Sequence, residues 1–423
     1  MGRDLKINIG NMVGGRISLP ASKSISNRAL VINALAGGTG KLENLAECDD
    51  TAAMVAALKK FREAAPGEPL AINIGAAGTA MRFLTAYFAM QEGHEVVLDG
   101  SERMRQRPIA TLVDALRDCG ADISYGMEEG FPPLVIKGKK LSANGGITID
   151  GGISSQYISA MMMIAPYMDG GLDLRIAGKL TSRPYVEMTA GIMRFFGADV
   201  EVGDNQIRIA GRHYDGSRNF SVESDWSAAS YWYEIKSLFP LMPVTLTGFA
   251  LTSWQGDSRV REIFKEFGIL TIYNGRDIEL AYYPSLKSES LDLDMSGQPA
   301  LAQTVVVAAC LHDMPFVVRG LKTLKIKETD RIAALISQLA KLGYAVEEGE
   351  DCSLVWDGSK SEAEGTVEIA TFDDHRMAMA FAPAAAKFND LVVLDSGVVS
   401  KSYPEYWKHL EEVGFKLEEW KGR

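Results

Sequence analysis

The sequence lacks the features that mark several large classes of protein. Its 4 cysteines are scattered without a CxxC pair, and its 5 histidines show no spacing typical of metal ligands. Acidic residues outnumber lysines and arginines by 55 to 44, so the net charge of −11 provides no basic field for nucleic acid or anionic lipid. We therefore expect a reduced, cytoplasmic protein with no structural metal and no nucleic-acid partner. Any bound anion would need a local cluster of bases.

Long apolar runs are missing as well. The first ten residues, MGRDLKINIG, contain nothing like the apolar core of a signal peptide. The longest apolar run, near 300–311, holds a glutamine and is too short to cross a bilayer. With 423 residues, 47% of them hydrophobic and 23% charged, the chain is expected to be a soluble globular protein of two or three domains. We expect a monomer without a membrane partner.

One pattern recurs along the chain: an amphipathic helix, then a glycine, then a short β-rich run. The glycines follow one another at intervals of roughly 70–77 residues, at Gly120, Gly197, Gly268, Gly343 and Gly414. Glycine suits this place because a helix commonly ends on a residue with positive φ. A degenerate first copy is expected at 52–61. Independent αβ units with similar caps would explain the pattern, but the even spacing favours six related units in two domains of three.

A second class of segment is apolar nearly all round, which predicts buried helices. These segments begin with small residues, hydroxyls and bases, at 23–28, 75–79, 151–156, 224–227 and 373–376. Ordinary N-capping would explain any one of them. Taken together they indicate more, because free N–H groups and the positive end of the helix dipole bind anions. If these starts face one cleft, the chain binds a substrate with several negative charges.

The most highly charged helix start is 325–331. It precedes an apolar helical face made of Ile332, Leu335, Ile336, Leu339 and Leu342. The spacing predicts that Lys327 and Arg331 lie one helical turn apart and project the same way, with Glu328 and Asp330 in the first turn. Ordinary surface charge is the alternative. Basic loops at 103–108, 182–185 and 400–404 add further donors, and arginine suits phosphate or carboxylate through paired hydrogen bonds.

Six short motifs in register resemble those of the EPSP synthases (3-phosphoshikimate 1-carboxyvinyltransferases), which are members of the enolpyruvyl transferase family. The motifs are Lys23-Ser-x-Ser-Asn-Arg28, Gly78-Thr-Ala-Met-Arg82, Arg107-Pro-Ile109, Ser154-Ser-Gln156, Lys327-Glu-Thr-Asp-Arg331 and Asp374-His-Arg376. The resemblance implies an inside-out α/β barrel of two domains, each built from three βαβαββ units, that close around substrate. We place the chain crossings near Pro20 and Val222, so that one domain is 21–222 and the other is 1–20 plus 223–423.

The resemblance also implies a reaction and the residues that perform it. The family transfers the enolpyruvyl group of phosphoenolpyruvate to the 5-hydroxyl of shikimate 3-phosphate, through a tetrahedral intermediate and without a cofactor. Glu328 is implied as the acid–base at carbon, with Lys23 and Lys327 beside it. The implied phosphoenolpyruvate ligands are Gly78, Arg107, Arg331, Arg376 and Lys401. The implied shikimate 3-phosphate ligands are Ser24, Arg28, Ser154, Ser155, Gln156, Ser182 and Tyr185, with Thr323 where many members carry Asn.

One departure from the family pattern bears on catalysis. The family has Pro-Asp-x-Ala where this chain has Pro299-Ala300-Leu-Ala, and that Asp is the implied base for the attacking hydroxyl. An alanine cannot accept a proton, and the loss of a general base costs about 10²–10⁴ in rate. The chain could be an engineered inactive variant, a natural homologue of weak activity, or an enzyme with another base such as Asp294.

Two rival functions remain at this point. The sister transferase that acts on UDP-N-acetylglucosamine carries a reactive cysteine in the loop before its Arg-Pro, but 99–107 contains no cysteine. A non-catalytic anion-binding protein is the rival from another class.

Overall fold

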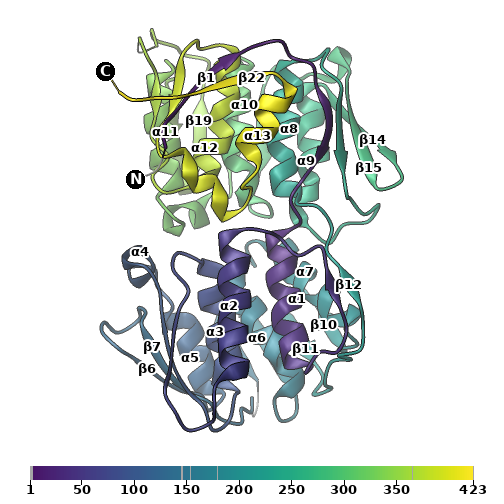
Figure 1. Cartoon of the computed structure of the whole chain (residues 1–423), viewed down its shortest axis with the longest axis vertical. Coiled ribbons are helices and arrows are strands. Elements are labelled where there is room, and N and C mark those ends of the chain that lie inside the picture. Colours follow the sequence, from purple (N-terminus) through teal and green to yellow (C-terminus); the bar gives the residue numbers. More distant parts are fainter. Residues whose placement is uncertain (1–2, 144–145, 153, 179, 364, 423) are drawn as a thin grey trace. The chain divides into compact units, whose positions relative to one another are not determined.

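The computed structural model describes residues 3–143, 146–152, 154–178, 180–363 and 365–422. Contacts within the chain divide it into two compact units (Figure 1). We call Ala21–Val222 the central unit, and Met1–Pro20 together with Glu223–Arg423 the terminal unit. The described strands form six separate sheets and no single closed barrel. Within the described residues, no helix combines the length and the apolar character needed to cross a membrane.

Five of the six sheets have four strands in the same order. In four of these sheets, taken in chain order, the first strand pairs in parallel with the second, the second pairs antiparallel with the fourth, and the fourth pairs antiparallel with the third. In the fifth, a strand from the N-terminus takes the place of the fourth strand. In the central unit these strands are β4 (Leu70–Asn73), β5 (Glu95–Asp99), β6 (Asp122–Tyr125) and β7 (Leu134–Lys137), then β8 (Ile147–Asp150), β9 (Leu172–Ala177), β10 (Val200–Val202) and β11 (Gln206–Ile209). Its third sheet has only two strands, β3 (Leu42–Glu43) and β12 (Phe220–Ser221).

The terminal unit repeats this order three times, and the N-terminus completes two of its sheets. One sheet is β16 (Leu291–Asp294), β17 (Phe316–Arg319), β18 (Glu347–Glu348) and β19 (Leu354–Trp356). The others join β2 (Gly15–Ser18) to β13 (Val244–Thr247), β14 (Ile269–Asn274) and β15 (Asp277–Tyr282), and β1 (Leu5–Ile9) to β20 (Glu368–Ile369), β21 (Leu391–Val393) and β22 (Phe415–Glu419). Because β1 pairs with β21 and β22, and β2 with β13, the first 20 residues belong with the C-terminal half.

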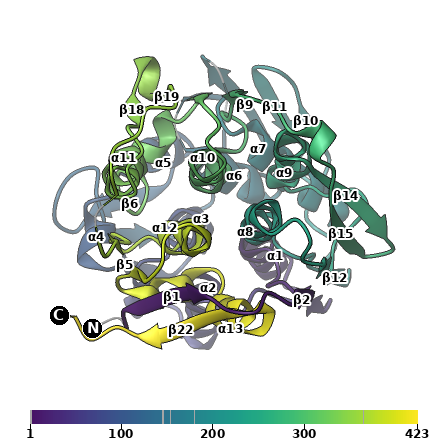
Figure 2. The same cartoon turned by 90° about the horizontal axis from the view of Figure 1, so that it is seen from above.

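Each unit has an inner set of three helices. They are α1 (Lys23–Leu35), α3 (Gly78–Ala89) and α6 (Ser155–Ile164) in the central unit, and α8 (Trp226–Leu238), α10 (Ala302–Leu311) and α12 (His375–Phe381) in the terminal unit. In Figure 2, α8, α10 and α12 lie inside the sheets of the terminal unit. All ten residues of α10 are buried. Apolar residues around the whole helix therefore predict burial correctly, as an apolar surface needs protein on every side.

The outer helices carry the repeat that the glycines marked. They are α2 (Asp49–Glu63), α5 (Ala110–Asp118), α7 (Arg183–Phe195), α9 (Val260–Ile263), α11 (Arg331–Lys341) and α13 (Tyr406–Val413). The short α4 (Glu102–Arg105) precedes α5 in the chain. The five turn glycines have φ between 83° and 114°, as predicted. The degenerate copy at α2 ends instead on Ala64 in an extended conformation.

Candidate active site

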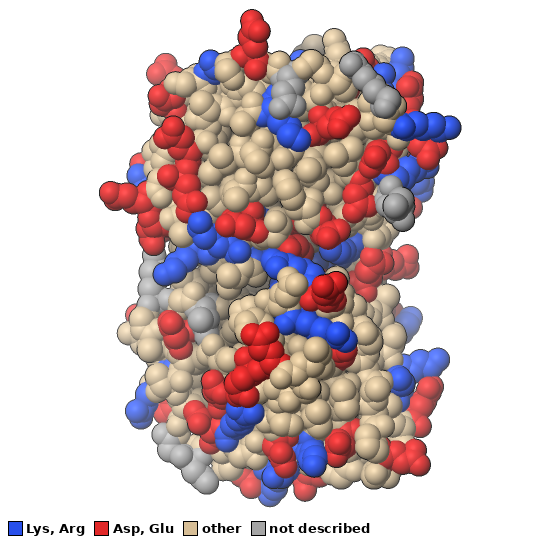
Figure 3. All heavy atoms as spheres, turned by 90° about the vertical axis from the view of Figure 1, so that its left-hand side faces the viewer, with Lys and Arg blue, Asp and Glu red and all other residues tan. Residues whose placement is uncertain are grey.

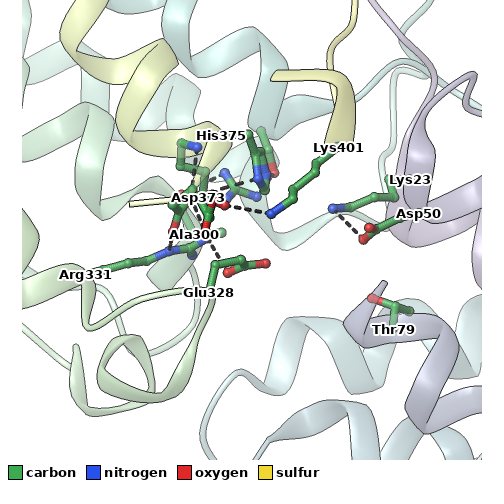
Figure 4. A network of polar contacts seen from close by, with 12 residues as sticks. Lys23, Asp50, Thr79, Ala300, Glu328, Arg331, Asp373, His375 and Lys401 are labelled. Atoms are coloured by element: carbon green, nitrogen blue, oxygen red, sulfur yellow. Dashed lines mark hydrogen bonds and ion pairs between the residues drawn. The ribbon is translucent and has the colours of Figure 1, made fainter. Parts of the chain in front are cut away.

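A buried ion-pair cluster lies where α11 and α12 begin. Arg331 donates from Nε to Asp374 Oδ2 at 2.6 Å and from Nη2 to Asp374 Oδ1 at 3.2 Å. The same Nη2 donates to Glu328 Oε2 at 2.9 Å (Figure 4). Asp374 is 0% exposed and Arg331 is 3% exposed. Burial would lower the pKa of Arg331, but the carboxylates of Asp374 and Glu328 outweigh it, so the pKa is raised.

The start of α11 differs from the sequence prediction. The helix begins at Arg331, and Asp330 caps it by accepting from the backbone N–H groups of Ile332 and Ala333 at 3.1 and 3.2 Å. Lys327 precedes the helix, with φ −87° and ψ −150°. Lys327 and Arg331 are therefore not one helical turn apart, and Glu328 reaches Arg331 from the preceding loop. The physical reason is that Asp330 is a strong N-cap, which stops the helix from starting earlier.

Arg376 ties the start of α12 to two neighbouring helix starts. Its Nη1 donates to the carbonyl oxygen of Ala300 at 2.9 Å, and its Nη2 donates to Ser227 Oγ at 3.3 Å. Ala300 lies just before α10, and Ser227 is the second residue of α8. Thus one guanidinium touches the segment that leads into each of the other two inner helices of the terminal unit.

Lys401 lies beside the same helix start. Its Nζ donates to the carbonyl oxygen of Asp373 at 2.7 Å. Phe372 and Asp373 both have positive φ, 53° and 56°, immediately before the cap of α12. Two consecutive non-glycine residues in this region cost about 1–3 kcal/mol each, and such strain gathers at functional sites. Thr323, in the 3-10 helix Lys322–Ile326, is buried, and its hydroxyl finds no hydrogen-bond partner among the described residues.

In the central unit, Lys23 opens α1 and pairs with a carboxylate. Its Nζ lies 3.1 Å from Oδ2 of Asp50, which is in the first turn of α2. Ser22 Oγ caps α1, and the Ser24 carbonyl oxygen accepts from Arg28 Nη1 at 2.9 Å. The ion pair holds the Lys23 ammonium at the N-terminal end of α1, which is the positive end of the helix dipole.

Arg107 lies directly over the first residue of α3. A Cβ atom built on Gly78 would come within 2.6 Å of Arg107 Nη1, so any larger residue there would displace the guanidinium. Arg107 is buried, and its Nε has no hydrogen-bond partner among the described residues. Arg82 fixes the surrounding backbone through the carbonyl oxygens of Gly78 and Pro108, both at 3.2 Å. A buried guanidinium with an unused donor, beside a helix N-terminus, is suited to an anion.

The start of α6 meets the start of α3. Gln156 Nε2 donates to Thr79 Oγ1 at 3.0 Å, and Ser154 Oγ caps α6 by accepting from the Gln156 N–H. Ser155 is buried. Ile153, which belonged to the predicted helix start, lies outside the described residues.

Arg28 forms a second buried group with Ser159 of α6 and Thr189 of α7. Arg28 is 2% exposed and donates to Thr189 Oγ1 at 2.7 Å and to Ser159 Oγ at 3.1 Å. Burial lowers its pKa to about 10, so the guanidinium stays charged at neutral pH. Ser182 precedes α7 with a φ of 54°, a left-handed conformation that is unusual for serine.

The sequence reasoning gave no role to three residues at these helix starts: Asp374 and Thr79, which stood within its motifs, and Asp50, which it did not select. Asp374 holds Arg331, Asp50 holds Lys23, and Thr79 holds Gln156. Each is an Asp or Thr at a helix start, where capping alone accounts for the residue type. The sequence signal that could have identified them is a polar residue next to another helix start, able to hold a side chain of the predicted site. Figure 3 shows acidic and basic side chains side by side on the visible surface, as the net charge of −11 with 44 bases implies.

The fold and these helix starts define an α/β protein of two three-unit domains, in which several helices of each unit begin beside cations. A family model for EPSP synthase (3-phosphoshikimate 1-carboxyvinyltransferase) matches residues 7–410. The chain is 48% identical over 408 residues to a 3-phosphoshikimate 1-carboxyvinyltransferase of Bacteroides fragilis strain YCH46, covering 96% of this chain and 97% of the relative. It is 38% identical over 423 residues to the Vibrio cholerae serotype O1 (strain M66-2) protein of the same name, and the match covers 95% of this chain and 97% of that relative.

Solved structures agree on the fold. An EPSP synthase from Acinetobacter baumannii superposes with a TM-score of 0.74 at 22% identity, over 99% of this chain and 100% of that one. A second structure from the same organism gives a TM-score of 0.75. The chain therefore belongs to the EPSP synthase family, and the predicted fold class is confirmed.

Proposed function

We propose that this chain transfers the enolpyruvyl group of phosphoenolpyruvate to the 5-hydroxyl of shikimate 3-phosphate and releases phosphate. The reaction serves the shikimate pathway, which leads to chorismate and the aromatic amino acids. The observation that carries the proposal is the family match over residues 7–410, which includes every helix start described above. Both substrates bear a phosphate and a carboxylate, and paired donors on arginine suit such groups.

Phosphoenolpyruvate is the proposed ligand of the cations at α3, α11 and α12. The buried Arg107 guanidinium over Gly78 supports a role in anion binding, because its Nε lacks a partner among the described residues. Arg331, Arg376 and Lys401 are proposed to hold the same substrate. Shikimate 3-phosphate is the proposed ligand of Ser24, Arg28, Ser154, Ser155, Gln156, Ser182, Tyr185 and Thr323.

Glu328 is the proposed acid–base at the methylene carbon of phosphoenolpyruvate, with Lys23 and Lys327 as cationic partners. Glu328 accepts a hydrogen bond from Arg331 at 2.9 Å. An anionic substrate at Arg331 would compete with Glu328 for the guanidinium. Substrate binding would then release the Glu328 carboxyl for proton transfer, so that the acid is freed only when its substrate is present.

Ala300 bears on turnover, and the alternative to the proposed transfer is an anion-binding homologue with little or no turnover. Phosphate release and calorimetric binding of shikimate 3-phosphate, measured on the native chain and on Ala300→Asp, separate the two. We expect slow release that needs both substrates, a rise of about 10²-fold or more in Ala300→Asp, and nearly unchanged binding. Tight binding with no release from either protein would establish the binding function instead. The absence of cysteine from 99–107 disfavours the UDP-N-acetylglucosamine reaction.

We further propose that the chain works in the cytoplasm, as a monomer and without a cofactor. All four cysteines are free, which is the usual state in a reducing compartment. A proton donor, a proton acceptor and cations suffice for addition and elimination, so the reaction requires no cofactor.

A further inference from the structure

A buried carboxylate in the terminal unit has no part in the proposed function as described so far. Asp257 lies in the 3-10 turn Gly256–Arg259 and is 4% exposed. Its Oδ2 accepts a hydrogen bond from Ser227 Oγ. Ser227 itself is only partly buried, near the start of α8, where its backbone N–H donates to Asp225 Oδ1 at 2.7 Å. The Ser227 hydroxyl therefore lies at the partly exposed start of α8 and is hydrogen-bonded to the buried carboxylate of Asp257.

Arg376 links this pair to the position of the missing base. Its two terminal nitrogens donate to the Ala300 carbonyl oxygen at 2.9 Å and to Ser227 Oγ at 3.3 Å. The two nitrogens belong to one rigid guanidinium, so Ser227 Oγ is held close to the backbone of residue 300. Asp294 is a weaker candidate, since its side chain is exposed and its Oδ1 accepts from the backbone N–H of Ser296 at 2.8 Å.

We propose that Ser227, backed by Asp257, accepts the proton that the family's Asp at position 300 would accept. This inference rests on the proposed function. Ser227 is the group that would touch the substrate, and Asp257 acts through it. The guanidinium of Arg376 at Ser227 Oγ stabilises the negative charge that develops there during the transfer.

The proton transfers balance over the two steps. In the addition, the 5-oxygen of shikimate 3-phosphate bonds to C2 of phosphoenolpyruvate. Its proton moves to Ser227 Oγ while the serine proton moves to Asp257, and Glu328 protonates C3. In the elimination, C3 returns a proton to Glu328 and the bond from C2 to the phosphate oxygen breaks. The leaving phosphate takes the proton from Asp257 through Ser227, which restores both residues.

A double-mutant cycle between positions 257 and 300 tests this role. The kcat of phosphate release is measured for the native chain, Asp257→Asn, Ala300→Asp and the double variant. We expect Asp257→Asn to lower kcat about tenfold or more in the native chain, and less than about threefold once Ala300→Asp supplies a direct base. An equal loss in both backgrounds, or no loss in the native chain, would overturn the proposal, because a structural aspartate would matter equally in both.

The controls separate this proposal from the proposed function and from misfolding. Like Asp257→Asn, Ser227→Ala should lower kcat strongly in the native chain and weakly in Ala300→Asp. It takes the place of Asp257→Asn in the cycle if that variant does not fold. Glu266→Gln is the matched control, because Glu266 also accepts a serine hydroxyl, from Ser288, away from Arg376. It should leave kcat unchanged in both backgrounds. Turnover by Ala300→Asp with both substrates upholds the proposed function whatever Asp257 does. If neither the native chain nor Ala300→Asp turns over, both proposals fail.

Discussion

Replacing Asp374 with alanine should destabilise the terminal unit severely. The carboxylate is 0% exposed, accepts two hydrogen bonds from Arg331, and caps α12 by accepting from the Arg376 N–H at 2.9 Å. Breaking a buried ion pair by removing one partner costs about 3–5 kcal/mol. Loss of an N-cap adds about 1 kcal/mol. We therefore expect the free energy of unfolding to fall by about 4–6 kcal/mol.

Urea unfolding followed by tryptophan fluorescence measures this loss in the right part of the chain. All 6 tryptophans lie between residues 226 and 420, so the signal reports on the terminal unit. Asp374→Asn keeps a capping oxygen and should lose less than Asp374→Ala. Asp292→Ala is the matched control, because it breaks an Arg–Asp pair with Arg319 in which both side chains are more than half exposed. That change should cost under about 1 kcal/mol.

The reasoning also predicts a partial rescue. If the cost of Asp374→Ala comes from leaving Arg331 buried without its partner, then adding Arg331→Met should recover part of the lost stability. A double variant that is less stable than Asp374→Ala by the full cost of Arg331→Met would refute that explanation. A loss of less than about 1 kcal/mol in Asp374→Ala itself would also refute it, because the Arg331–Asp374 pair would then be no stronger than an exposed ion pair.

Two further predictions concern Gly78 and His312. In Gly78→Ala the new methyl group would push against the end of the flexible Arg107 side chain, so we expect little change in the free energy of unfolding. Calorimetry should show phosphoenolpyruvate binding weakened about tenfold or more. Unchanged binding would contradict the proposal that Arg107 and Gly78 hold this substrate. Burial and the nearby charges of Lys287 and Lys387 lower the pKa of His312 to about 4 from its ordinary 6.5. Between these two pH values the ring is neutral in the folded protein and gains a proton on unfolding. The free energy of unfolding should therefore fall as the pH drops from 6.5 towards 4. His312→Gln should flatten that decline in urea unfolding, and an equally steep decline would count against it.

The repeat was readable from sequence because each unit carries the same local chemistry. A glycine with positive φ ends five of the outer helices, and apolar residues surround the inner ones, so spacing alone located both sets. The start of α10 was not among the predicted helix starts, because Pro299 and Ala300 carry neither a hydroxyl nor a charge. The pairing of β1 with β21 and β22 was also hidden, since strands at opposite ends of a chain share no local signal.

At the site, the sequence identified residue types better than contacts. Arg331 was selected for its charge, but its buried partner Asp374 lies 43 positions away. The predicted turn from Lys327 to Arg331 was wrong because Asp330 caps the helix after Lys327. Ser227 was expected to start a helix, whereas its contacts with Arg376 and Asp257 depend on the packing of three helix starts. The roles assigned to the site residues stay predictions.

Phosphorus NMR of the native chain incubated with phosphoenolpyruvate and shikimate 3-phosphate tests the central claim most directly. The account predicts that inorganic phosphate and the enolpyruvyl ether of shikimate 3-phosphate appear slowly, in equal amounts, and only when both substrates are present. Phosphate without the ether, or phosphate from phosphoenolpyruvate alone, would contradict the proposed transfer. So would unchanged spectra from the native chain and from Ala300→Asp alike.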